Sequence, residues 1–297
     1  MVERNKRFSI FANILLCIMS FLALFPFLLM IASSLSDEET LLTYGYSFYP
    51  RVLSLTAYQY IWSNALTIFR AYGITIFVTV VGTVTGVVCT VLLAYPLSIP
   101  DMPHRKLVSF LIYFTMLFNG GLVPTYMMYT NIFHLKNTIW ALIIPALLMR
   151  AYYVILTRSY FQTSIPREVL EAARVDGASE FRIFWTLVWP MSIPIIATIG
   201  LMQGLAYWND WTNGLYYINE QKLYSIQVLL NVMISDIKAL QSDMNLAATA
   251  GSSAAANLPS TSIRMAIAVI GILPVLVIYP YFQKYFVKGL TLGAVKG

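Results

Sequence analysis

The side chains that could contact a small polar molecule lie within or beside long apolar runs. A charged residue near the middle of a membrane-spanning helix costs about 2.5 to 3.5 kcal/mol, so it marks a transport path or finds a partner acid. Aromatic rings beside hydrogen-bonding groups also suit a sugar, which has an apolar face and many hydroxyls. Six residues fit this description: Asn119, Arg150, Tyr152, Trp208, Asn209 and Asp210.

Each of these six residues also has a purely structural interpretation. Arg150 could pair with Asp210 or with an acid on another chain; otherwise it suits an anionic saccharide. Asn119 lies next to two glycines, where helix packing is the alternative to substrate contact. For Trp208 and the two residues after it the alternative is anchoring at the membrane surface, and Tyr152 could simply pack. The sequence leaves both interpretations open.

Residues for catalysis or metal binding are scarce. The two histidines, His104 and His134, are far apart, and both cysteines, Cys17 and Cys89, lie in apolar runs. This pattern excludes a histidine cluster, a disulfide framework and a thiolate metal site, and the apolar runs hold no pair of carboxylates for acid-base work. The chain has no P-loop glycine motif, so we expect this chain to bind neither ATP nor Mg²⁺. An enzyme that works within the membrane is therefore not expected.

The elements that carry the six residues are predicted to be membrane-spanning helices. The chain has 297 residues, 59% of them hydrophobic and 11% charged, with a mean hydropathy of +0.70. About 20 apolar residues cross the hydrocarbon core. Six runs meet this length, at residues 8–32, 72–99, 107–130, 138–157, 191–217 and 263–286. We predict an all-α integral membrane fold of about six transmembrane helices that makes a single domain over residues 1–297.

The positions of Lys and Arg predict which segments face the cytoplasm. If the N-terminus is inside, 12 of the 19 basic residues fall in cytoplasmic segments, six fall in external ones and Arg150 lies within a span. Because positive charge is retained on the cytoplasmic side, both termini and the segment 158–190 are predicted to be cytoplasmic. Such scattered basic residues form no nucleic-acid footprint. Of the two long external segments, 33–71 and 218–262, the second is predicted to be an extracellular loop.

Segment 158–190 is predicted to form a helix, a tight turn and a second helix. Pro166 suits the first turn of a helix, and Gly177 can end that helix in the left-handed conformation. Ser179 can cap the next helix, and Pro190 is expected to break it at the membrane entry. The result is a short helical element between two apolar runs.

The first of these helices and its turn have two different faces. Glu171, Arg174 and Asp176 form a polar face, and Ala172 and Ala173 belong to a small or apolar one. Two interpretations fit: an amphipathic loop on the lipid headgroups, or a rigid knob that docks on a cytoplasmic protein. Periodicity alone does not separate them.

The residues of this segment resemble a known motif. The stretch "EAARVDGASEFRIFWTLVWP" is similar to the EAA loop of the membrane subunits of binding-protein-dependent ABC importers. The stretches "FNGGLVPTYM" and "WND" and the tail "YPYFQKYFVKGLTLGAVKG" resemble the carbohydrate-uptake permeases, specifically the maltose-type second subunit and its Gram-positive relatives. In that family the loop supplies coupling helices that fit a groove on the ATPase. The residues that the resemblance and the polar face assign to ATPase coupling are Glu171, Ala172, Ala173, Arg174, Asp176 and Gly177.

The resemblance also implies a function and a set of partners. We expect a permease subunit of an ATP-driven importer that moves a saccharide or oligosaccharide into a bacterial cell by alternating access, as a multi-pass protein of the plasma membrane. The implied partners are a homologous second permease subunit, a cytoplasmic ATPase dimer that binds ATP and Mg²⁺, an extracellular solute-binding protein and membrane lipid. An acidic saccharide is the hypothesis that Arg150 adds. The alternative is an ion-coupled secondary transporter of a polar solute, for which an internal repeat and several acidic or histidine residues in the spans are expected.

Overall fold

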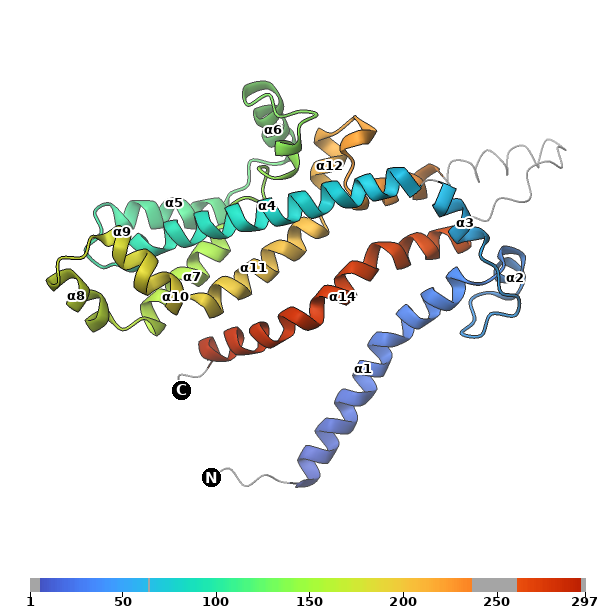
Figure 1. Ribbon diagram of the computed structural model, residues 1–297, viewed down its shortest axis with the longest axis horizontal. Coiled ribbons are helices and arrows are strands. Elements are labelled where there is room, and N and C mark those ends of the chain that lie inside the picture. Colours follow the sequence, from blue (N-terminus) through green and yellow to red (C-terminus); the bar gives the residue numbers. More distant parts are fainter. Residues whose placement is uncertain (1–5, 64, 237–260, 295–297) are drawn as a thin grey trace. The chain divides into compact units, whose positions relative to one another are not determined.

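The computed structural model describes residues 6–63, 65–236 and 261–294, which are mostly helical (Figure 1). Within these ranges no strand is formed, and extended pairing is limited to an isolated antiparallel bridge between Ser36 and Leu53. The chain divides into two units. Unit 1 comprises residues 1–67 and 230–275, and unit 2 comprises residues 68–229 and 276–297.

The helices follow one another along the chain with short connections. Unit 1 holds α1 (Lys6–Ser34), α2 (Glu38–Tyr44), α3 (Thr56–Ser63) and the first part of α14 (Thr261–Ala294). Unit 2 takes up most of α4 (Ala65–Ser98), then α5 (Arg105–Leu117), α6 (Leu122–Met127) with a π-helical turn (Met128–Ile132), a 3-10 helix (Ile139–Leu142) and α7 (Ala151–Ser164). It continues with α8 (Arg167–Val175), α9 (Glu180–Ile183), a second π-helical turn (Phe184–Val188), α10 (Trp189–Met191), α11 (Ile193–Trp208) and α12 (Thr212–Tyr217).

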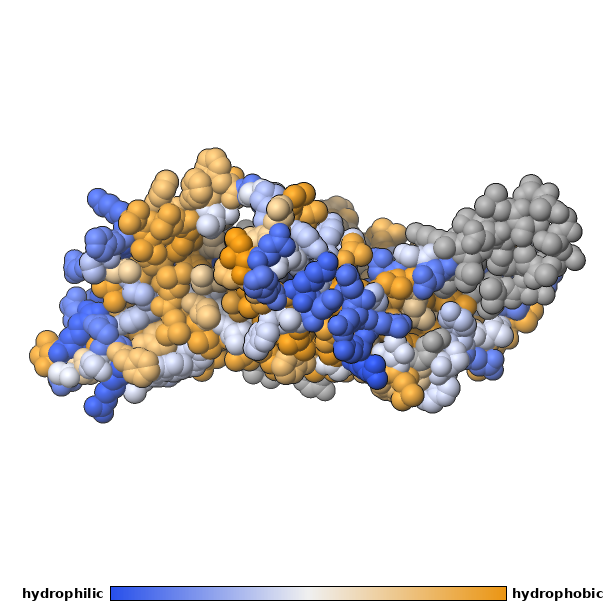
Figure 2. Space-filling model, turned by 90° about the horizontal axis from the view of Figure 1, so that it is seen from above, coloured by the Kyte–Doolittle hydropathy of each residue, from blue (hydrophilic) through white to orange (hydrophobic). Residues whose placement is uncertain are grey.

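Two helices are each long and apolar enough to cross a membrane, the segment Phe8–Ser34 of α1 and the whole of α4. Two further pairs qualify if each bent pair is one span: α5 with Leu122–Ile132, bent by 117°, and Glu180–Met191 with α11, bent by 77°. The described residues thus contain two such spans, or up to four. Figure 2 shows hydrophobic residues gathered in patches on the visible face, with hydrophilic residues between them.

Three predicted spans, 8–32, 72–99 and 263–286, correspond to continuous helices. Span 8–32 is α1, and span 72–99 is α4, which begins earlier, at Ala65. The backbone of span 263–286 lies within α14, which continues to Ala294. The predicted extracellular loop 218–262 contains a 3-10 turn (Gln221–Leu223) and an apolar helix, Ile226–Asp236. Its small-residue run, residues 246–260, lies outside the described residues.

The predicted spans 107–130 and 191–217 are wrong as continuous helices. The first is interrupted after α5, where Gly121 takes a φ of 84° and its N–H donates to Oδ1 of Asn119 at 2.9 Å. The second is interrupted after Trp208, because Oδ1 of Asp210 accepts from the N–H of Thr212 at 3.2 Å and starts a new helix, α12. Small polar residues that bind the backbone locally compete with a regular helix, and apolar neighbours do not prevent it.

The predicted span 138–157 is also wrong as a continuous helix. Its 3-10 helix ends at Leu142, and regular helix resumes only at Ala151. Pro145 has no N–H to donate and its ring would clash with the carbonyl four residues earlier, while Ala146 takes a left-handed φ of 58°. We call residues 143–150 the linker segment. Because nearly all of it is apolar, hydropathy does not distinguish it from a helix.

Pro190 does not break the second helix of segment 158–190, contrary to the prediction. It lies inside α10, directly after the π-helical turn, and the chain bends at Ser192 instead. A wider π turn changes the hydrogen-bond spacing, so the missing N–H of a proline can be accommodated there.

Three buried side chains of α11 and α12 hold the linker segment. Gln203, Tyr207 and Asn213 are 1%, 2% and 7% exposed, and each donates to a linker carbonyl. The acceptors are the oxygens of Leu147 (3.1 Å) and Leu148 (3.2 Å) for Gln203, Ile143 (2.8 Å) for Tyr207 and Pro145 (3.0 Å) for Asn213. Irregular backbone at membrane depth is tolerated only when such partners satisfy it. These bonds therefore allow the interruption of the helix.

Two glycines of α4 make room for these side chains. A Cβ on Gly82 would lie 2.5 Å from Cζ of Tyr207. A Cβ on Gly86 would collide with the amide of Gln203 and lie 2.6 Å from the carbonyl oxygen of Leu148. Small residues let helix backbones approach closely, and here they admit the groups that bind the linker segment.

In unit 1, Glu38 of α2 joins two parts of the chain that are far apart in sequence. Its carboxylate accepts from the N–H groups of Thr261 and Ser262 and from Oγ of Ser262, each at 2.8 Å. Burial acts to raise the pKa of Glu38, but the hydrogen bonds from Ser262 and Thr261 outweigh it and hold the pKa below its ordinary value. The ionised carboxylate thus caps the N-terminus of α14, where negative charge is favourable.

Replacing Gly86 with alanine is expected to destabilise the protein, because the new methyl group meets a backbone oxygen that cannot move aside. Overpacking of this kind costs about 1–3 kcal/mol. Gly73→Ala on the same helix is the matched control, since nothing lies within 4 Å of its Cβ and alanine favours a helix. The midpoint of thermal unfolding of the purified protein should fall for Gly86→Ala and hold or rise for Gly73→Ala. Equal midpoints would contradict this packing.

Candidate functional site

Helix α8 ends in a turn that requires glycine. Gly177 takes a φ of 81°, and the N–H groups of Gly177 and Ala178 donate to carbonyls three and five residues earlier, each at 3.0 Å. This is a Schellman motif, in which the glycine position is left-handed. Oγ of Ser179 accepts from the N–H of Arg182 at 3.4 Å and caps α9. The predicted roles of Gly177 and Ser179 in the turn are confirmed.

The turn between α8 and α9 is tied to α4. Nε of Arg174 lies 2.6 Å from Oε1 of Glu180, and the hydroxyl of Tyr95 on α4 donates to Oε2 of Glu180 at 2.8 Å. On the apolar side, Leu170 and Ala173 pack against the buried cluster that includes Tyr95. The coupling candidates Ala173 and Arg174 are thus engaged in holding the element together. A displacement of α8 would be transmitted to α4 through these contacts.

The outward side of this element combines charges with exposed apolar groups. Glu171, Ala172 and Asp176 are exposed, and Val175 is 87% exposed. On α9 the ring of Phe181 is 72% exposed. Val175 and Phe181 are not among the coupling residues predicted from the sequence; the signal for them is an apolar residue on each side of the Gly177 turn. Hydrophilic side chains also gather at the end of unit 2 that carries α8 (Figures 1 and 2).

Arg150 lies at the start of α7, where the linker segment ends, and not within a helix as predicted. It is half-buried, and its guanidinium carbon lies 5.9 Å from the centroid of the Tyr153 ring. Arg150 and Asp210 are close enough for their charges to interact. Both are described residues, and no ion pair joins them. Arg150 and Asp210 therefore interact only through their charges and do not form the direct pair that was one of the two interpretations.

The other candidates for substrate contact have different surroundings. Asn119 is exposed at the break between α5 and α6, and Tyr152 is 51% exposed beside Tyr153, with ring centroids 6.0 Å apart. Trp208 is buried at the end of α11 with its ring 6.4 Å from that of Tyr72. Its indole N–H is buried and has no hydrogen-bond partner among the described residues.

The side chains of Asn209 and Asp210 form hydrogen bonds with the nearby backbone. Nδ2 of Asn209 donates to the carbonyl of Leu205 at 2.9 Å, and Asp210 accepts from the N–H groups of Thr212 and Asn213. These bonds end α11 and start α12. Within the part of the chain that the structure describes, no group of three or more His, Cys, Asp or Glu could hold a metal ion.

The sequence model of the family described as "Binding-protein-dependent transport system inner membrane component" matches residues 73–292. This range covers the α8–α9 element and every residue discussed above as a candidate for substrate contact. The chain belongs to this family. It is a permease subunit, a membrane component of a transport system that works with a binding protein, and not an enzyme.

The permease is similar to proteins of Bacillus subtilis over nearly its whole length. It is 37% identical to the protein LplC over 278 residues, 93% of this chain and 90% of LplC. It is 35% identical over 294 residues to YtcP, described as a polygalacturonan/rhamnogalacturonan transport system permease protein, with 99% and 100% of the two chains covered.

A solved structure has the same fold. It is a chain of a bacterial ABC transporter involved in the import of the acidic polysaccharide alginate, and it is 29% identical to the permease with a TM-score of 0.79. The match covers 96% of the permease and 99% of that chain. The fold described above is therefore that of a known membrane permease.

Gly177→Ala is expected to loosen the end of α8, because an L-residue in the left-handed conformation costs about 1–2 kcal/mol. Backbone amides of α8 should then exchange with deuterium about tenfold faster. Gly120→Ala is the control: its Cβ also meets nothing within 4 Å, but its φ is not in the left-handed range. Unchanged exchange in Gly177→Ala, or an equal increase at α8 in both variants, would contradict the assignment.

Proposed function

We propose that this permease moves a saccharide or oligosaccharide into the cell as one membrane subunit of an ATP-driven importer, and that the saccharide carries carboxylate groups. The observation that carries the importer mechanism is the α8–α9 element, which is exposed on one side and bound to α4 on the other. The names of the relatives, one on polygalacturonan and rhamnogalacturonan and one on the acidic polysaccharide alginate, support the substrate class.

The proposed topology has six spans and two cytoplasmic termini. α1, α4, the two bent pairs and α14 supply five of the spans, and the linker segment with the helices on each side of it supplies the sixth. The distribution of basic residues supports this orientation, with 12 on the inner side and six on the outer. Segment 158–190 then lies in the cytoplasm, and loop 218–262 lies outside the cell.

In this mechanism a cytoplasmic ATPase dimer binds ATP and Mg²⁺ and contacts the exposed side of α8. Glu171, Ala172 and Asp176 contact the ATPase, together with the apolar groups of Val175 and Phe181. Ala173, Arg174 and Gly177 keep α8 rigid, so that ATPase closure pulls on the helices behind it. The permease pairs with a homologous second permease, and the central path between them opens alternately to the outside and the inside. An extracellular solute-binding protein delivers the saccharide.

Glu171→Arg should release the ATPase, because it reverses a charge and adds bulk on the proposed docking side without touching the buried cluster. Glu39→Arg on α2 makes the same change on another exposed helix and is the control. Purification of the tagged permease from its native membrane, followed by mass spectrometry, should find the ATPase with the wild type and the control but not with Glu171→Arg. The second permease should accompany all three. ATPase retained by Glu171→Arg would contradict the docking role.

The substrate path is proposed to pass Arg150. The guanidinium has no ion-pair partner among the described residues, so it can bind a carboxylate with paired hydrogen bonds. Asn119, Tyr152, Trp208, Asn209 and Asp210 are proposed to line the path as well. For Trp208 the indole N–H supports this, because it has no partner in the described ranges and a saccharide hydroxyl could accept from it.

Arg150→Ala should reduce uptake of an acidic oligosaccharide by roughly tenfold or more, the worth of a hydrogen bond to a charged group. Uptake of a neutral oligosaccharide of the same length should change little. Arg70→Ala, at an exposed arginine of α4, is the control and should affect neither. The reconstituted complex with radiolabelled sugars provides the measurement, and an equal loss for acidic and neutral sugars would contradict a charge-specific contact.

An ion-coupled mechanism is not favoured. Its one acidic candidate in the apolar runs, Asp210, accepts two backbone N–H groups and caps α12. A carboxylate that is bound in this way is poorly placed to gain and lose a coupling ion.

A further inference from the structure

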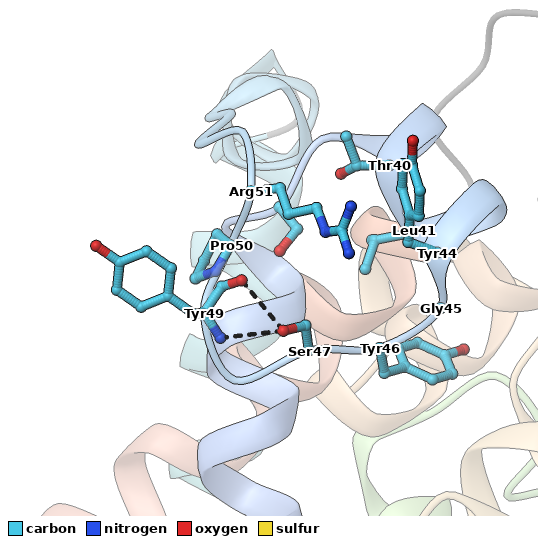
Figure 3. A pocket seen from close by; sticks show the side chains of 10 residues that line it. Thr40, Leu41, Tyr44, Gly45, Tyr46, Ser47, Tyr49, Pro50 and Arg51 are labelled. Atoms are coloured by element: carbon cyan, nitrogen blue, oxygen red, sulfur yellow. Dashed lines mark hydrogen bonds between the residues drawn. The ribbon is translucent and has the colours of Figure 1, made fainter.

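The segment between α1 and α4 contains a cavity of about 210 Å³ on the α2 side of unit 1 (Figure 3). Its lining combines aromatic rings, hydroxyls and one cation. The lining residues used below are Ser36, Thr40, Tyr44, Tyr46, Ser47 and Arg51. Arg51 comes from the loop after α2, and its guanidinium points toward α2 in Figure 3.

The loop that carries Arg51 is anchored at both ends. The bridge between Ser36 and Leu53 is closed by the N–H of Asp37 donating to the carbonyl of Val52 at 3.0 Å and by the N–H of Ser54 donating to that of Leu35 at 2.9 Å. α2 itself is fixed by the carboxylate of Glu38 at the N-terminus of α14. The cavity is thus built on anchored backbone, although its rim is exposed.

Arg51 has no acidic partner within the part of the chain that the structure describes. Its guanidinium carbon lies 4.0 Å from the centroid of the Tyr44 ring, a cation–π contact that orients the group. Among the described residues no carboxylate forms an ion pair with it. An oriented guanidinium without an acid presents its N–H donors in the fork that matches a carboxylate.

Two hydroxyls of the cavity are oriented by backbone carbonyls at the end of α1 and the start of α2. Oγ1 of Thr40 donates to the carbonyl of Asp37 at 2.8 Å, and Oγ of Ser36 donates to that of Ala32 at 2.8 Å. Their oxygens therefore keep acceptor capacity, which suits the hydroxyl groups of a sugar. The ring of Tyr46, at the edge of the cavity in Figure 3, offers an apolar face.

We propose that this cavity is a second binding site for an acidic saccharide, in which Arg51 binds the carboxylate of one uronate unit, a Tyr44 or Tyr46 ring covers its apolar face and the hydroxyls of Ser36 and Thr40 accept from the sugar. The inference rests on the proposed saccharide substrate and goes beyond the path at Arg150. On the proposed topology the cavity opens outside the cell, where it holds one end of an oligosaccharide before translocation. The cavity is concave, and its lining combines aromatic rings with hydroxyls and one cation. Both features favour a sugar as the ligand over a protein, which would bind through a flatter surface.

Direct binding of trigalacturonate to the purified complex in lipid nanodiscs, without the solute-binding protein, tests this site. The trimethyl ester of the same trisaccharide serves as the neutral probe, and titration calorimetry provides the affinities. We expect the wild type to bind the acid roughly tenfold or more tightly than the ester. When these variants are compared in an Arg150→Ala background, which removes the contact proposed for the path, Arg51→Gln should abolish that difference and Arg51→Lys should keep part of it. The control Arg70→Gln in the same background should keep all of it.

Two results would overturn the proposal. One is equal affinity for acid and ester in the wild type. The other is an Arg51→Gln variant that binds trigalacturonate normally. If that variant instead fails to bind the solute-binding protein, Arg51 belongs to a protein contact and the proposal is also overturned. Intact assembly of each variant is checked by its ATPase activity. ATP-driven uptake of trigalacturonate by the wild type tests the proposed function separately. If uptake occurs but Arg51 has no effect on binding, the second binding site is contradicted while the proposed function stands.

Discussion

The fold of this permease depends on satisfying backbone polar groups where the chain is not helical. In hydrocarbon an unpaired carbonyl costs several kcal/mol, so an interruption such as the linker segment needs donors from the protein itself. Gln203, Tyr207 and Asn213 supply these donors, and Gly82 and Gly86 leave the space for two of them. The same arrangement places Arg150 where helix resumes, half-buried and without an ion-pair partner among the described residues. The interruption of the helix at the linker segment thus explains both the buried hydrogen bonds and the position of Arg150.

The α8–α9 element is held in place on one side while its other side remains exposed. Its turn is closed by backbone hydrogen bonds at Gly177, its inner side packs on the buried cluster, and the pair of Arg174 with Glu180 reaches Tyr95 on α4. An exposed ion pair alone contributes little to stability, but here one of its members also accepts a buried tyrosine hydroxyl. These contacts would carry a force on α8 to α4, as the proposed coupling requires.

Sequence reasoning succeeded where the deciding interactions are local. The roles of Gly177 and Ser179 follow from the few residues around them, and the helices α1 and α4 follow from long apolar runs without polar interruptions. It failed for spans 107–130, 138–157 and 191–217, since hydropathy reports burial from water and not continuity of a helix. The interruptions depend on local caps at Asn119 and Asp210 and on side chains such as Gln203, which binds carbonyls more than 50 residues away in the sequence. The contact of Tyr95 with Glu180, 85 residues apart, was likewise beyond a local pattern.

In the mechanism that we propose, ATP hydrolysis on a partner chain is transmitted through α8 and drives saccharide movement through this permease. The most direct measurement is uptake of a labelled acidic oligosaccharide into proteoliposomes that contain the purified complex and the solute-binding protein. The two conditions to compare are ATP with Mg²⁺ on the ATPase side and a proton or sodium gradient without ATP. We expect uptake to require hydrolysable ATP and to be the same with and without the gradient. Uptake driven by the gradient alone would contradict it.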